Sequence, residues 1–341
     1  MKFSSLLEKL LKKDDLTAEE AETAMKGIME KKFTDSQTGA FLAGLQAKGV
    51  AAEELSAFVK VLQSFAVKIN VNAMPLIDTC GTGGDLSSTF NISTTAAFVL
   101  AGCGVKVAKH GNRSVSSACG SADLLTALGV AISLTPAQVK QCIEQAGIGF
   151  LFAPIYHPAF KNVANIRKEL GIKTVFNLLG PLLNPANVSG QVIGVYDPEL
   201  TELFADVLKN KGIKHALVVH GNGLDELSLS GKNKITELKE GKIKTYYVSA
   251  ADIGLKECSA DNLKGGSVEK NAEIFLSILK GEQSPRRDIV LFNAAAGIIV
   301  AGKAHGFLEG IELAKKSIDN GNALRIFEKF KEKSNDFAEN S

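Results

Sequence analysis

The spacing of apolar residues changes once along this 341-residue chain, near Val71. Before that position, apolar residues recur only at helical spacing, and Thr17 and Glu20 form the sequence pattern of a helix N-terminal cap. After it, short apolar runs alternate with helical segments, which predicts a parallel sheet covered by helices. We therefore expect an α/β protein in two parts, a small helical domain at 1–70 and a large α/β domain at 71–341 with a central, mostly parallel sheet.

The larger part divides into elements that turn residues and caps separate. Strands are predicted at 74–78, 105–111, 149–153, 191–197 and 215–221. Helices are predicted at 93–104, 121–129, 135–147, 157–171, 201–212, 272–282 and 291–304. The segment 176–185 suits a loop or broken helix, and 235–248 a hairpin that turns at Glu240 and Gly241. We expect the tail from residue 331 to be frayed.

Charge and cysteine content exclude several classes of protein. The formal net charge is only +2, which argues against a dedicated nucleic-acid binder. No apolar run of about 18 residues occurs, so no membrane span is expected. The five cysteines are odd in number and widely spaced, and no CxxC pair exists. They indicate neither a disulfide framework nor a zinc site, and they favour a reducing compartment such as the cytoplasm.

A glycine cluster, CGTGG, follows the first predicted strand within residues 78–85. Glycines let backbone amides approach an oxyanion closely and permit the positive φ angles that aim successive amides at one point. The dinucleotide fingerprint fails because Leu86 stands at its third glycine position, and no Gly-Lys-Ser/Thr follows for a nucleotide-triphosphate loop. Taken alone, the loop suits an anion-binding site or an ordinary strand–helix turn equally well.

Two further segments add polar groups to the same predicted edge. Residues 89–94 place several small polar side chains where a helix begins, more than capping requires, and helix N-termini attract anions. Residues 109–117 combine two cations, a glycine and three serines at the end of a predicted strand. Such a loop neutralises and hydrogen-bonds phosphate, although a solvated basic loop has the same composition. This loop leaves its strand on the same edge as the glycine cluster, which is where α/β proteins bind ligands.

Asp225 and Glu226 stand in a glycine-rich loop, HGNGLDELS, where both carboxylates can turn to one side. Two hard oxygen ligands without a nearby His or Cys suit Mg²⁺, although adjacent acidic residues are also common on surfaces. Arg167 lies on a predicted helix with polar faces, where a guanidinium either meets solvent or binds a carboxylate with two hydrogen bonds. Cys80 has no activating partner, so we interpret it as a packed side chain.

Together these segments resemble the anthranilate phosphoribosyltransferase family. The family pattern GTGGD, NIST, KHGNRSVSS and GSAD, then a helix with Arg and a DE pair, is present in order. The central segment YHPAFKNVANIRKELGIKTVFNLLGPLLNP is also similar almost throughout. The resemblance covers nearly the whole chain. It implies transfer of the phosphoribosyl group of 5-phosphoribosyl 1-pyrophosphate to the amine of anthranilate, the second step of tryptophan biosynthesis.

The resemblance also implies roles for individual residues. The donor would be bound by Gly81, Thr82, Gly83, Gly84, Asp85, Thr89, Asn91, Ile92, Ser93, Thr94, Lys109, His110, Gly111, Asn112, Arg113, Ser114, Val115, Ser116, Ser117 and Ser121. Anthranilate would be bound by Gly81, His110, Asn112 and Arg167. Mg²⁺ would be bound by Ser93, Asp225 and Glu226. Catalytic roles are implied for Lys109, His110 and Arg113.

The same resemblance implies a fold similar to that of nucleoside phosphorylases and a homodimer that associates through the helical domain. The helix around Arg167 is expected to complete that domain, at about 160–180. Two alternatives remain. A pyrimidine nucleoside phosphorylase shares the fold, but the Asp225 and Glu226 pair and the KHGNRS loop argue against it. A non-catalytic nucleic-acid-binding relative should have a strongly basic surface and lack the acidic pair.

Overall fold

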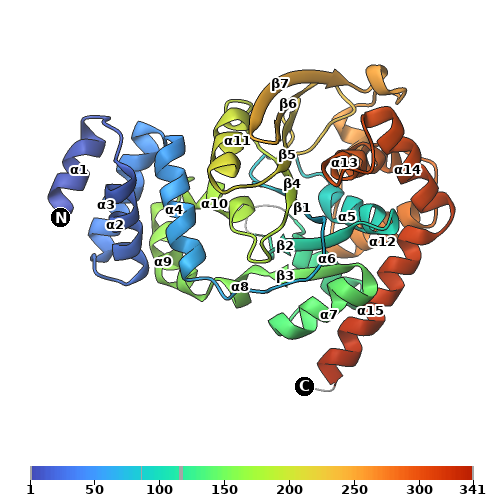
Figure 1. The fold of residues 1–341 in the computed structure, drawn as a ribbon, viewed down its shortest axis with the longest axis horizontal. Coiled ribbons are helices and arrows are strands. Elements are labelled where there is room, and N and C mark those ends of the chain that lie inside the picture. Colours follow the sequence, from blue (N-terminus) through green and yellow to red (C-terminus); the bar gives the residue numbers. More distant parts are fainter. Residues whose placement is uncertain (1, 86, 115–117, 340–341) are drawn as a thin grey trace.

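The computed structural model describes residues 2–85, 87–114 and 118–339. The chain begins with four helices at one end of the molecule (Figure 1): α1 Phe3–Leu11, α2 Ala18–Met29, α3 Asp35–Lys48 and α4 Ala52–Ser64. The hydroxyl groups of Thr17 and Thr34 each accept a hydrogen bond from a backbone amide three residues on. The side chains of Glu20 and Gln37 in turn accept a bond from the backbone amide of the capping threonine. Both capping boxes explain why α2 and α3 begin where they do.

A seven-stranded sheet forms the centre of the larger part. Its strands are β1 Leu76–Gly81, β2 Lys106–Gly111, β3 Ile148–Phe152, β4 Gly190–Gly194, β5 His215–Gly221, β6 Lys232–Lys239 and β7 Lys242–Ser249. The spatial order is β3-β2-β1-β4-β5-β6-β7, parallel from β3 to β5 and antiparallel from β5 to β7. Glu240 and Gly241, at φ 46° and 76°, turn the β6–β7 hairpin where the sequence predicts it.

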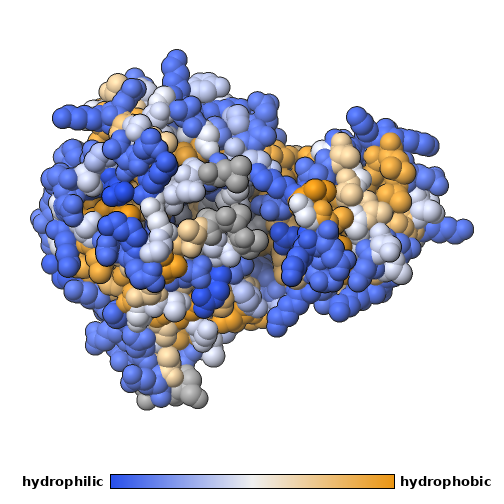
Figure 2. Space-filling model, turned by 180° about the vertical axis from the view of Figure 1, so that it is seen from behind, coloured by the Kyte–Doolittle hydropathy of each residue, from blue (hydrophilic) through white to orange (hydrophobic). Residues whose placement is uncertain are grey.

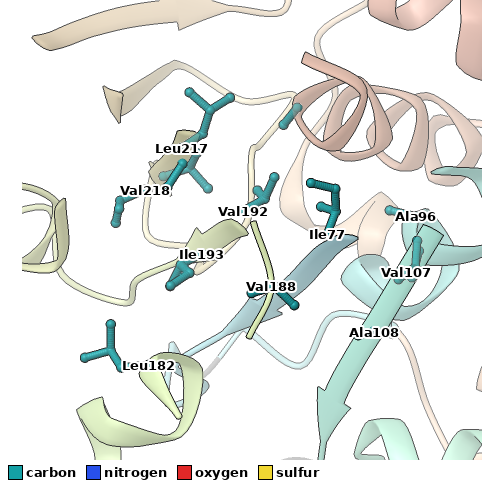
Figure 3. Close-up of a cluster of buried hydrophobic side chains, with 14 of the residues drawn as sticks. Ile77, Ala96, Val107, Ala108, Leu182, Val188, Val192, Ile193, Leu217 and Val218 are labelled. Carbon is teal, nitrogen blue, oxygen red and sulfur yellow. The ribbon is translucent and has the colours of Figure 1, made fainter. Parts of the chain in front are cut away.

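Helices cover both faces of the sheet (Figure 1). Those of the larger part are α5 Ile92–Gly102, α6 Ser121–Ala127, α7 Pro136–Ala146, α8 Ala153–Tyr156, α9 Lys161–Leu170, α10 Phe176–Leu182, α11 Leu200–Asn210, α12 Val268–Leu279, α13 Pro285–Val300, α14 Phe307–Asp319 and α15 Asn322–Glu339. Short 3₁₀ turns lie at Pro158–Phe160, Ala251–Ile253 and Ala260–Leu263. In Figure 3, Ile77 of β1 and Val107 of β2 lie beside Ala96 of α5 in the core. The predicted α/β fold class is confirmed.

The helix α9 leaves the sheet and packs beside the N-terminal helices (Figure 1). Its Asn162 side chain donates a hydrogen bond of 2.9 Å to the carbonyl of Met29, at the end of α2. Seen from behind, the lobe that contains α1–α4 is set off from the larger lobe by a furrow (Figure 2). The exact division of the chain into domains stays a prediction.

Three local expectations have definite outcomes. The segment expected to be a loop or broken helix forms α10, with Pro181 in its last turn. The tail is not frayed over residues 331–339, because α15 continues to Glu339 and its buried Ser334 accepts a hydrogen bond from the backbone amide of Ala131. Within the described ranges, no helix has the length and apolar character needed to cross a membrane.

Candidate active site

The candidate site lies at the carboxyl ends of β1 and β4. The chain passes from β1 to β2 and β3 on one side, and β4 and β5 continue on the other, so connections diverge between β1 and β4. Such a switch point leaves space for a ligand outside the strand ends. The segments singled out in the sequence converge there. Asp225 and Glu226 are here called the carboxylate pair, and Asp225 passes directly over the last residues of both strands, Gly81 and Gly194.

The glycine loop, residues 81–85, lies against the carboxylate pair. Gly83 and Gly84 have φ angles of 67° and 77°, which favour glycine. The amide of Thr82 donates to the carbonyl of Gly194 at 2.9 Å, which holds the loop to β4. The amide of Gly83 donates to Oδ2 of Asp225 at 2.7 Å. An amide of this loop therefore already binds a carboxylate oxygen, as expected of an anion-binding loop.

The start of α5 faces the second carboxylate. The amide of Ser93 donates to Oε1 of Glu226 at 3.0 Å, so the helix N-terminus points its amide at an anion. Asn91 stands at the cap position but makes no capping bond, and its side chain donates to the carbonyl of Cys119 at 3.0 Å. Ile92 and Thr94 are buried, and Thr89 forms an isolated bridge with Lys264. The polar groups of this segment therefore do more than cap a helix.

Lys109 lies under both segments. It is 3% exposed, and its ammonium group donates to the carbonyl of Thr79 at 2.6 Å and lies 3.4 Å from Oγ of Ser93. Burial lowers its pKa, because a desolvated ammonium group is less stable than a hydrated one. Burial raises the pKa of Asp225, with a contribution from Asp85, and burial also raises that of Glu226, with a contribution from Asp225. The site thus holds closely spaced ionisable groups, none of which forms a salt bridge among the described residues.

The carboxylate pair fits a magnesium ion. Within the described residues no three His, Cys, Asp or Glu side chains form a ready-made metal cage. Mg²⁺ does not require one, since it binds one or two carboxylates together with substrate phosphates and water. A divalent cation would also stabilise the ionised forms that burial disfavours in Asp225 and Glu226. Ser93 contacts both kinds of group, since its amide donates to Glu226 and its hydroxyl lies 3.4 Å from the ammonium group of Lys109.

The described part of the basic loop, residues 109–114, is held by Asp123. The guanidinium group of Arg113 binds Oδ1 of Asp123 at 2.9 Å, and the amides of Ser114 and Gly120 donate to its Oδ2. Ser121 donates to the carbonyl of Asn112 at 3.2 Å. Val115, Ser116 and Ser117, predicted as donor ligands, lie outside the described residues. In this structure Arg113 therefore pairs with Asp123 and not with Asp225 or Glu226.

Ring contacts connect the basic loop to Arg167. Four successive pairs, His110–His157, His157–Phe160, Phe160–Phe176 and Arg167–Phe176, have centres 5.1, 5.5, 5.5 and 5.4 Å apart. Burial lowers the pKa of His110 to about 3 and that of His157 to about 4, so both imidazoles are neutral at pH 7. The row gives the predicted anthranilate residues an aromatic wall. Sequence reasoning missed His157, Phe160 and Phe176, which carry no spacing signal.

Lys173 is a second feature that the sequence did not reveal. Its ammonium group donates to the carbonyl of Gly84 at 3.0 Å and lies 3.6 Å from the ring centre of Tyr196. The only sequence signal is its place just after Gly171, which ends α9 at φ 62°. This lysine links the segment that follows Arg167 to the glycine loop.

The fold and this site define a class of enzyme. Residues 4–66 match the family described as "Glycosyl transferase family, helical bundle domain", and residues 73–324 match "Glycosyl transferase family, a/b domain". A site with an anion-binding glycine loop, a buried lysine and a carboxylate pair is consistent with this class.

Similar proteins identify one family within this class of enzyme. Anthranilate phosphoribosyltransferase of Petrotoga mobilis is 50% identical over 98% of this chain and 97% of its own. That of Alkaliphilus metalliredigens is 51% identical over 93% of this chain and 94% of its own. The crystal structure of the Thermus thermophilus enzyme has a TM-score of 0.92 at 40% identity, covering 97% of this chain and 99% of that one. A Saccharomyces cerevisiae structure, in complex with PRPP and Mg, has a TM-score of 0.89 at 30% identity over 98% of each chain. The chain belongs to the anthranilate phosphoribosyltransferase family.

Proposed function

We propose that the protein transfers the phosphoribosyl group of 5-phosphoribosyl 1-pyrophosphate to the amine of anthranilate, releasing pyrophosphate. The observation that carries the proposal is the convergence at one sheet edge of two anion-seeking amides, a buried lysine and a carboxylate pair. Lone surface acids or a plain strand–helix turn would not bring these groups together. The reaction is the second step of tryptophan biosynthesis.

The donor carries most of the charge that the site must balance. We assign its phosphate oxygens to the amides of the glycine loop, to the start of α5 and to the basic loop, with Lys109 beside the pyrophosphate. As the bond between carbon 1 and the pyrophosphate oxygen breaks, its electron pair leaves with pyrophosphate. Lys109 stabilises that growing negative charge from a buried position, where electrostatic interactions are stronger than in water.

The acceptor needs positioning more than activation. The aromatic amine of anthranilate is neutral at pH 7 and forms the new bond to carbon 1 with its own lone pair, then loses a proton. We propose that Arg167 binds its carboxylate and that the neutral His110 packs against its ring. Asn112 and Gly81 complete the acceptor site. Arg167 is suited to this role because no carboxylate of the described residues pairs with it, and its guanidinium group is held over the ring of Phe176.

Mg²⁺ would be held by Ser93, Asp225 and Glu226 together with donor oxygens. Bound there, it would neutralise the leaving pyrophosphate as a Lewis acid. Support comes from the geometry of the carboxylate pair and from the yeast relative whose structure contains PRPP and Mg.

We also propose a homodimer that associates through the helical domain, in the cytoplasm. Apolar side chains gather on the lobe of α1–α4 (Figure 2), and Leu11 at the end of α1 is 72% exposed. An exposed apolar patch of this kind suits a protein interface. The five cysteines are all free, as expected in a reducing compartment.

The proposal is tested by the fluorescence of anthranilate. Adding 5-phosphoribosyl 1-pyrophosphate and Mg²⁺ to the protein should remove that fluorescence and yield N-(5-phosphoribosyl)anthranilate by mass spectrometry. Omitting either substrate or the metal should stop the change. Cleavage of pyrimidine nucleosides by inorganic phosphate, with no use of anthranilate, would instead identify a nucleoside phosphorylase. A salt-sensitive gel shift without turnover would identify a nucleic-acid binder.

A further inference from the structure

The carboxylate pair stands in a segment that has almost no regular hydrogen bonding of its own. Between Gly221 and Gly231 the chain forms turns and bends, with one isolated bridge from Gly221 to Leu224. A segment of this kind normally moves, yet a metal site needs its carboxylates held in place. The partners of the neighbouring backbone, at Leu227 and Ser228, therefore decide how firmly the pair is held.

Asn293 of α13 provides the first of these partners. Its Oδ1 accepts from the amide of Leu227 at 3.0 Å, and its Nδ2 donates to the carbonyl of Leu227 at 2.9 Å. Nδ2 also donates to the carbonyl of Ile289, one turn earlier in α13, at 2.9 Å. The side chain is 3% exposed. One buried amide thus binds both polar groups of the residue next to Glu226 and anchors them to a long helix.

Asn233 of β6 repeats this arrangement on the next residue. Its Oδ1 accepts from the amide of Ser228 at 2.6 Å, and its Nδ2 donates to the carbonyl of Ser228 at 3.0 Å. Nδ2 also donates to the carbonyl of Val248, its neighbour on β7, at 2.9 Å. Asn233 has no exposed surface. Two asparagines from separate elements therefore hold consecutive residues. Each side-chain amide accepts one hydrogen bond and donates two.

Three glycines let the pair lie directly on the sheet edge. Gly81, Gly194 and Gly221 are the last residues of β1, β4 and β5. A Cβ at Gly194 would overlap the carbonyl of Asp225, one at Gly81 would overlap its Oδ2, and one at Gly221 would overlap the carbonyl of Glu226. The pair is thus bounded by strand ends beneath it and by the two asparagines on its C-terminal side.

We propose that Asn293 and Asn233 are positioning residues that fix the backbone after the carboxylate pair and thereby hold Asp225 and Glu226 in the geometry that a divalent cation requires. The inference rests on the proposed function, because it assigns the two asparagines to the metal site of that reaction. Groups that orient metal ligands from outside are worth about 10- to 100-fold in metal affinity. An asparagine with only a general structural role would affect stability and leave metal affinity unchanged.

Binding of Mn²⁺ to the protein with pyrophosphate tests the proposal, and it is followed by the electron paramagnetic resonance spectrum of protein-bound Mn²⁺ against a Mn²⁺–pyrophosphate solution without protein. Asn293→Leu keeps the branching of the side chain at Cγ, with a larger volume, and removes all three hydrogen bonds. Asn293→Ser is the second variant, in case the first does not fold. The control is Ser317→Ala on α14, which removes a buried bond of 2.8 Å to the carbonyl of Val99, away from the site. Melting temperatures identify variants of similar stability.

We expect the Mn²⁺ dissociation constant to rise about 10-fold or more in either Asn293 variant and in Asn233→Ser, and to stay as in the wild type in Ser317→Ala. The concentration of Mg²⁺ needed for half-maximal activity should rise in parallel, while the KM for anthranilate stays constant. A folded Asn293 variant with wild-type Mn²⁺ affinity would overturn the inference alone. A wild-type protein that binds no Mn²⁺ with pyrophosphate would overturn both this inference and the metal part of the proposed function.

Discussion

Two clusters of acidic side chains in this molecule differ in how their charge is balanced. In the helical lobe, Glu54 is fully buried and accepts bonds from the amides of Leu16 and Ala51, at 2.9 and 2.8 Å, and from the ammonium group of Lys48 at 2.9 Å. Lys48 also binds Asp15, and these acidic partners raise its pKa against the effect of burial. This cluster is complete without any ligand.

The carboxylate pair at the sheet edge is the opposite case. Asp225 and Glu226 each accept one backbone amide, and no cation of the described residues forms an ion pair with either. Burial raises both pKa values, whereas Lys109 nearby only partly offsets this for Glu226. A folded protein retains such a cost where function requires it. The first cluster is balanced within the fold, and the unbalanced second cluster supports the proposal that it binds a ligand.

The largest expected effect comes from neutralising the carboxylate pair. Asp225→Asn with Glu226→Gln keeps the shapes of both side chains, so the fold should remain, but removes the metal ligands. Loss of a Lewis acid worth about 4 kcal/mol would lower kcat about 1000-fold. Steady-state rates across a Mg²⁺ titration measure this. Wild-type turnover and metal response in the double variant would remove the distinction between the two clusters.

Lys48→Met should have the reverse profile. It leaves Glu54 buried without its cation, and breaking a buried ion pair in this way costs about 3 kcal/mol of unfolding free energy. Urea denaturation measures that loss, while kcat and both KM values at 25 °C should not change. Lys60→Met, which breaks an exposed pair with Glu22, is the control and should change little. A Lys48 variant with normal stability and reduced turnover would contradict the comparison.

Arg167 is a half-buried cation without a described carboxylate partner, and Arg167→Ala tests whether a ligand balances its charge. Burial lowers the pKa of this guanidinium group, and no described carboxylate balances it. If anthranilate supplies the missing carboxylate, the KM for anthranilate should rise about 10- to 100-fold, as expected for a lost charged hydrogen bond. The KM for the donor should stay close to that of the wild type. Equal increases in both constants would count against the assignment.

The smallest expected effect is a gain in stability. Because the folded pKa values of the pair exceed the unfolded value near 4, the folded protein binds more protons above that pH, and stability falls as pH rises through this window. With metal chelated at pH 8, Asp225→Asn with Glu226→Gln should therefore be more stable than the wild type by about 1 kcal/mol. Melting curves at pH 5 and pH 8 should show this advantage shrinking at the lower pH. A less stable variant at pH 8 would mean that the pair supports the fold.

The local features of the molecule could be predicted from the sequence. Alternating apolar runs predicted the strands from β1 to β5, and Glu240 with Gly241 predicted the hairpin of β6 and β7. Because parallel strands end at one edge, the glycine loop and the basic loop could also be expected to approach each other. The order of the motifs then indicated the anthranilate phosphoribosyltransferase family, to which the similar proteins belong.

The long-range parts could not be predicted. Gly83 bonds to Asp225 across 142 positions of sequence, and no spacing rule connects two such loops. The position of the carboxylate pair depends on glycines that end three different strands and on Asn293. In the sequence, Asn293 is one polar residue in an apolar helix. The length of α15 depended on burial of Ser334 against the segment after α6, not on local composition.

We propose that the carboxylate pair is incomplete until a divalent cation arrives with the phosphoribosyl donor. The most direct test starts from wild-type protein freed of metal by a chelator, with anthranilate and 5-phosphoribosyl 1-pyrophosphate already present. Fluorescence should stay constant until Mg²⁺ is added and then fall at a rate that saturates with Mg²⁺ concentration. Full-rate loss of fluorescence before any Mg²⁺ is added would contradict the claim.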